Sequence, residues 1–98
     1  MALLISTDTG FALRLASAWA AAGDDVTAVL CDRAAATART GHPVRPAIDE
    51  AGKAGVQVVV HDEALDRHAV GGGTGLPRLD LEELATLVSE RAERVVWW

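Results

Sequence analysis

Short apolar runs alternate with longer mixed segments along the whole chain, and the runs predict β-strands. Three of them are compact and rich in branched or small side chains, and they lie at Ala2–Ser6, Val26–Cys31 and Val56–Val60. Two weaker runs, Leu76–Leu79 and Val95–Trp98, predict short further strands. Continuous apolar runs of this length are typical of strands buried on both faces, as in a parallel sheet.

The segments between these runs have helical spacing or helix boundaries. Helices are predicted at Phe11–Ala22, Pro46–Ala54 and Leu81–Ala92, and Ala34–Arg39 has helical propensity. Asp8 or Thr9 can cap the first helix, and Asp80 with Glu83 resembles a capping box before the last one. The faces expected to be buried are Phe11, Leu15, Ala18 and Ala22 in the first helix and Leu81, Leu84, Ala85, Val88 and Ala92 in the last.

The order of these elements predicts the fold class. A strand, a helix and a second strand occupy the first thirty or so residues, which indicates a βαβ unit. Repetition of the pattern gives a three-layer α/β/α sandwich with a mostly parallel sheet of four or five strands. The 98 residues contain no repeat and no linker that would divide them, so we expect a single domain, residues 1–98.

Composition and charge narrow the possible partners. The formal net charge of −5 disfavours nucleic acid or an anionic membrane as the main partner, because both attract basic surfaces. The single cysteine, Cys31, excludes an internal disulfide and fits a reducing cytoplasm. No apolar run reaches the roughly 20 residues of a membrane span, and the first residues lack the basic region of a secretory signal.

Polar loops that follow the strands are the candidate binding regions, because ligands gather at the carboxyl ends of parallel strands. The turn Ser6–Gly10 precedes a helix and is suited to an anion, but it lacks a phosphate-loop pattern, so a capped turn is favoured. The glycines of Gly71–Gly75 permit close approach of the backbone to a ligand, although a flexible loop tip is the favoured interpretation.

Cys31 and the histidines are the candidate chemical groups. A Cys31 thiolate could carry sulfur if its pKa were lowered, but a buried structural cysteine is favoured. A zinc set of Cys31, His42, His61, Asp62 and His68 has no compact ligand spacing, and no metal site is expected. His61 and Asp62 could form a general-base pair, although adjacent strand residues point to opposite faces. The terminal Trp97-Trp98 pair favours a subunit interface slightly over packing within the chain.

Four stretches share their order and spacing with one known family. Ala28–Asp32 matches a family strand that ends in a turn with an aspartate, here Asp32, and Ala51–Val58 matches the helix end and glycine before the central strand. His61–Arg67 matches an acidic segment that ends with an arginine, here Arg67, and Asp80–Trp98 matches the last helix and strand. By these stretches the chain resembles the DsrE/DsrF/DsrH family of sulfur-relay proteins, and most closely its DsrH/TusB branch.

The resemblance implies a small α/β sandwich that assembles into homo- or hetero-oligomers with DsrE-like subunits. Some members pass persulfide sulfur through a cysteine in the loop after the central strand; the corresponding loop here, about His61–Gly75, has none. The DsrH/TusB branch commonly lacks that cysteine too and acts as a structural partner. The implied function is therefore a non-catalytic or divergent subunit of a sulfur-transfer assembly, without a cofactor.

Two departures from the family pattern affect the presumed binding edge. Arg33 and His68 replace glycines of the family motifs, which alters backbone freedom at both points. Cys31 as a displaced persulfide site is the less favoured version, and a small-molecule or nucleotide-binding module is the alternative function. The expected ligand-binding residues are Ser6, Thr7, Asp8, Thr9, Asp32, Arg33, His61, Asp62, Arg67 and His68.

Overall fold

The computed structural model describes residues 1–61 and 75–97. Its strands are β1 (Ala2–Ser6), β2 (Val26–Leu30), β3 (Gln57–His61), β4 (Arg78–Leu79) and β5 (Arg94–Trp97). Its helices are α1 (Thr9–Ala21), α2 (Arg33–Ala36), α3 (Arg45–Lys53) and α5 (Leu81–Thr86), and α5 continues into a π-helical turn, η1 (Leu87–Arg91). Every strand expected from the sequence is therefore present, β1 with the predicted boundaries and the others with boundaries shifted by one or two residues.

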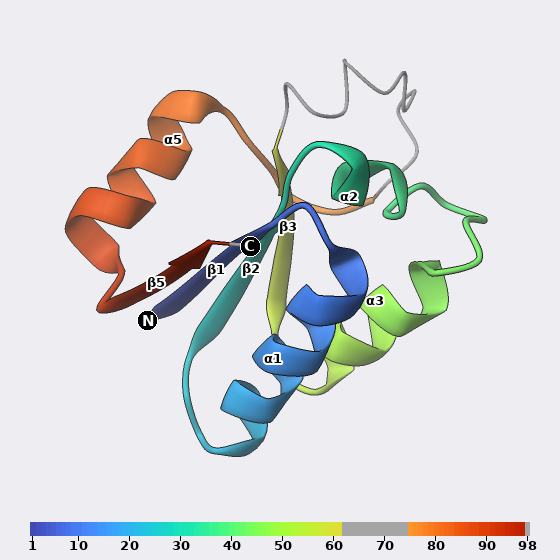
Figure 1. Ribbon diagram of the computed structural model, residues 1–98, viewed down its shortest axis with the longest axis horizontal. Coiled ribbons are helices and arrows are strands. Elements are labelled where there is room, and N and C mark those ends of the chain that lie inside the picture. The colour runs from blue at the N-terminus through green and yellow to red at the C-terminus, as the bar shows by residue number, and fades with distance from the viewer. Residues whose placement is uncertain (62–74, 98) are drawn as a thin grey trace.

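The strands form one five-stranded sheet in the order β4-β3-β2-β1-β5, and every pair in it is parallel. Figure 1 shows α1, α2 and α3 on one side of this sheet and α5 on the other. The predicted three-layer α/β/α sandwich is thus confirmed. The order also leaves β4 and β5 as the two edges of the sheet.

Alternate residues of each inner strand pack into two separate cores. Leu4 and Val60 belong to the larger core, which lies beneath α1, α2 and α3. Among the described residues, the smaller core beneath α5 has five buried members, which are Leu3, Ile5, Val29, Val59 and Leu84. Because one short helix covers that face, much of its apolar surface stays only partly buried.

The buried face of α1 differs from the prediction. Its buried residues are Thr9, Ala12, Leu13 and Ala16, whereas Ala18 and Ala22 are exposed and Phe11 and Leu15 are half-buried. The helix begins at Thr9, two residues earlier than expected, because the Asp8 carboxylate accepts a hydrogen bond from the Phe11 amide at 3.1 Å. The stripe of small residues then faces the sheet, where it allows close packing.

The buried face of the last helix was predicted in part. Leu84 is buried, and Val88 and Ala92 are partly buried against the smaller core as predicted, whereas Leu81 is 68% exposed and Ala85 is exposed. Two features explain the difference. The helix α5 covers only part of the sheet face on which it packs, and the wide turn of η1 interrupts the regular α-helical spacing. The described part of the predicted run Val95–Trp98, residues 95–97, is likewise not a buried strand, because β5 is an edge and Trp97 is 64% exposed.

Candidate functional site

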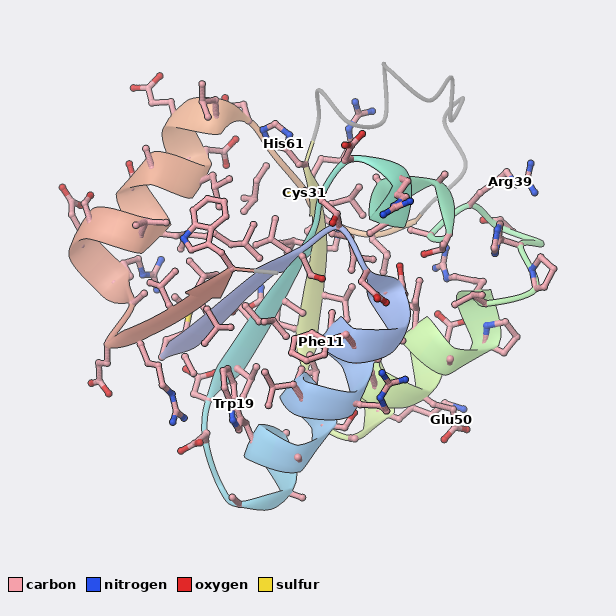
Figure 2. All side chains as sticks on the ribbon, viewed as in Figure 1. Phe11, Trp19, Cys31, Arg39, Glu50 and His61 are labelled. Atoms are coloured by element: carbon pink, nitrogen blue, oxygen red, sulfur yellow. The ribbon has the colours of Figure 1, made fainter. Side chains whose placement is uncertain are left out.

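The carboxyl ends of the three central strands lie side by side and form one rim of the sheet. Ser6 pairs in register with Leu30, and Leu30 pairs with Val60. Cys31, which follows β2, and His61, the last residue of β3, therefore neighbour each other at this rim. Figure 2 shows both side chains near this end of the strands.

Cys31 and His61 share the α5 face of the sheet. Cys31 packs against the smaller core, and His61 alternates along β3 with Val59, a member of that core. The Nε2 atom of His61 is buried and has no hydrogen-bond partner among the residues that the structure describes. A buried ring nitrogen without a partner costs free energy, so this atom is a point of strain or of unmet binding capacity at the rim.

The surroundings of Cys31 hold it in the thiol form. Desolvation by burial, followed in size by the nearby Asp32 charge, raises the pKa of Cys31 from 9.0 to about 11. Reactive cysteines have the opposite surroundings, with a cation or a helix N-terminus that stabilises the thiolate. At neutral pH the Cys31 thiolate is therefore scarcer than for an ordinary cysteine.

The backbone of Asp32 adopts an unusual conformation directly after Cys31. Its φ of 53° and ψ of −131° make it the single non-glycine residue with positive φ in the described ranges 1–61 and 75–97. Such a conformation costs on the order of 1–3 kcal/mol in a residue with a side chain. The turn that reverses the chain from β2 into α2 is therefore strained at the residue whose charge acts on Cys31.

The turn between β1 and α1 uses most of its polar groups internally. The fully buried Ser6 hydroxyl donates to the carbonyl of Asp8 at 2.9 Å and accepts from the amide of Asp8 at 2.9 Å. Thr9 is also buried, and its Oγ1 lies 2.8 Å from Oγ1 of Thr37. Thr37 in turn donates to the Ala34 carbonyl at 2.7 Å. These contacts support the capped-turn interpretation and tie α1 to α2.

A hollow of about 370 Å³ opens beside this turn, on the α1 side of the sheet. Its lining consists of Thr7, Asp8, Thr9, Gly10, Arg33, Ala34, Thr37 and Val44. The exposed Arg33 is the cation of this set, and the amino end of α1 borders it. A helix N-terminus beside a guanidinium is electrostatically suited to an anion.

The sheet separates the predicted site residues into two groups. Thr7, Asp8, Thr9 and Arg33 meet at the α1 hollow, whereas Cys31 and His61 lie on the α5 face. Asp62, Arg67, His68 and Trp98, as well as Gly71–Gly73, lie outside the described residues. Sequence reasoning missed the contributions of Thr37 and Val44 to the hollow, because no local pattern marks a residue that the α2–α3 connection folds against α1.

The described residues contain neither a cluster of potential metal ligands nor a helix suited to span a membrane. Across them, no three His, Cys, Asp or Glu side chains gather closely enough to hold a metal ion. His42 instead accepts a hydrogen bond at Nδ1 from the Val44 amide at 3.1 Å, within its own turn. None of the helices in ranges 1–61 and 75–97 has the length and apolar character needed to cross a membrane.

Comparison with known proteins adds no assignment to this geometry. No protein-family model matches the chain, and no curated protein is significantly similar to it.

Proposed function

We propose that this chain is a non-catalytic or divergent subunit of an oligomeric sulfur-transfer assembly of the DsrE/DsrH type, acting in the cytoplasm. The link to sulfur transfer rests on the resemblance of four sequence stretches, and the three-layer α/β fold agrees with it. The reducing cytoplasm is favoured because the sole cysteine is free.

The protonation state of the Cys31 thiol is the observation that supports a non-catalytic role. A persulfide carrier must attack a donor sulfur as a thiolate. Cys31 has a pKa raised to about 11 and is partly buried, so it is a poor nucleophile at neutral pH. Sulfur is then carried by another subunit, which has a cysteine in the loop after its central strand.

The edge strand β5 supports the assembly part of the proposal. It ends the sheet and carries Trp97, which is 64% exposed. Trp97 follows Val95 by two residues and therefore shares the sparsely covered α5 face. A tryptophan in such a position is the type of side chain that anchors a subunit contact, and we assign it to contact with a second DsrE-like chain.

Persulfide loading followed by alkylation and mass spectrometry tests the non-catalytic role. Under conditions that load a cysteine-bearing carrier of the same family, we expect no persulfide on Cys31. Purification of the tagged chain from its native cell should then yield a DsrE-type subunit that has the loop cysteine. Efficient direct loading of Cys31, or recovery of the chain without any such subunit, contradicts the proposal.

The α1 hollow favours a second candidate, a module that binds a small anionic molecule or nucleotide. It places Arg33 beside the amino end of α1 in a recess of about 370 Å³. A thermal-shift screen with nucleotides and inorganic anions separates the two functions, because a ligand of the native state raises the apparent melting temperature. Stabilisation that is lost in Arg33→Gln but kept in Arg91→Gln, which changes an exposed arginine on the α5 side of the sheet, would support this alternative.

A further inference from the structure

A second recess lies on the α5 face and extends from the amino ends of β2 and β3 towards β4. Two adjoining hollows of about 230 and 270 Å³ share Leu79, Leu87 and Arg91 as lining residues. The smaller hollow also contacts Thr27 and Gln57, which pair with each other near the amino ends of β2 and β3. The smaller hollow therefore begins at the amino ends of these strands, and its Leu79 wall lies beside His61.

The smaller hollow combines apolar walls with polar groups at its margin. Val59, Leu79 and Leu87 supply apolar surface. The Thr27 hydroxyl lies 3.2 Å from Sδ of Met1 and 3.4 Å from Oε1 of Gln57. Because the Gln57 oxygen faces this hydroxyl, the amide nitrogen of Gln57 is left as a donor. Among the residues that the structure describes, the Arg91 guanidinium has no ion-pair partner.

The π-helical turn η1 forms one wall of this recess. It is closed by a hydrogen bond from the Ala92 amide to the Leu87 carbonyl at 2.9 Å, five residues back. Leu87 and Arg91 are the first and last residues of the turn, and both line the two hollows. Such wide turns are rare and occur frequently at functional sites.

We propose that the smaller hollow binds a small monocarboxylate with an apolar body about the size of phenylacetate. Arg91 and the Gln57 amide would donate to the carboxylate, and the walls would cover the body. A cavity of about 150 Å³ accepts a benzene ring, so 230 Å³ accommodates a ring with its carboxylate. The nearby acid, Glu83, lines only the larger hollow and accepts a hydrogen bond from the Asp80 amide at 3.3 Å.

Titration of the ¹⁵N-labelled chain with phenylacetate, followed by NMR, tests this site. We expect saturable shifts of the Gln57 side-chain amide and of the Leu87 and Arg91 amides. Arg91→Gln should weaken binding about tenfold or more, because it removes a charge-assisted hydrogen bond, and Arg91→Lys should keep part of it. The control Arg39→Gln changes an exposed arginine on the other side of the sheet and should bind normally.

Three outcomes overturn the site. The first is equal binding of phenylacetate and its neutral amide, or of wild type and Arg91→Gln. The second is an absence of shifts around the recess, or shifts confined to the α1 hollow. The third is movement of the recess signals with protein concentration alone, which would show that a second copy of the chain covers this surface. The site does not depend on the proposed sulfur-relay role.

Discussion

Asp32 shows how a single residue of the rim controls the chemistry of its neighbour. Its carboxylate is the second cause of the raised Cys31 pKa, after burial of the thiol. Replacement by asparagine keeps a side chain that tolerates positive φ, but it removes the charge. We therefore expect Asp32→Asn to lower the Cys31 pKa below about 11 while desolvation keeps it above 9.0.

The pH dependence of alkylation by iodoacetamide measures this change, because only the thiolate reacts. Reaction at pH 9 should be several-fold faster in Asp32→Asn than in wild type, since one pKa unit is about tenfold in thiolate below the pKa. Asp8→Asn removes a charge from another strand end of the rim and serves as the control. An unchanged or slower reaction in Asp32→Asn would show that its charge does not act on Cys31.

At the scale of elements, α5 depends on its cap more than on its packing. Leu84 is its one buried residue, whereas both bonds of the capping box between Asp80 and Glu83 are present, at 2.8 and 3.3 Å. Asp80→Ala should lower the free energy of unfolding by about 1 kcal/mol and speed hydrogen exchange through α5 and η1. Glu83→Gln preserves the box and should have little effect. Equal losses in both variants would contradict this account.

Local sequence signals predicted where the helices and strands lie better than they predicted which face of each helix is buried. The Asp80–Glu83 box and the left-handed Gly23 and Gly55, with φ of 95° and 103°, follow from nearby sequence and are present. The inward faces of α1 and α5 depend instead on where each helix meets the sheet, which no local pattern fixes. The same reason explains why the predicted site residues lie on two faces of the sheet. Alternation along β2 and β3 places Cys31 and His61 on the α5 face, whereas helix packing places Arg33 and Thr37 on the α1 face.

At the scale of the whole molecule, helices cover the two faces of the sheet unequally. Within residues 1–61 and 75–97, sixteen buried residues form the core under α1, α2 and α3, against five under α5. Beside β5, the α5 face also has partly buried apolar residues, including Ala92 and Val95. A small domain gains stability when such surface is buried by a partner, so the unequal coverage agrees with the proposed assembly.

Trp97 gives this proposal a direct test in the isolated protein. We expect wild type to have a solution mass that is a multiple of 10.3 kDa, and Trp97→Lys to dissociate towards the single-chain mass, because a charge replaces the aromatic anchor. Light scattering coupled to size exclusion measures both. Leu81→Lys is the matched control, since Leu81 is equally exposed at 68% but lies on α5 rather than on the edge strand. If Trp97→Lys keeps the wild-type mass while Leu81→Lys loses it, the contact belongs to α5 and not to β5.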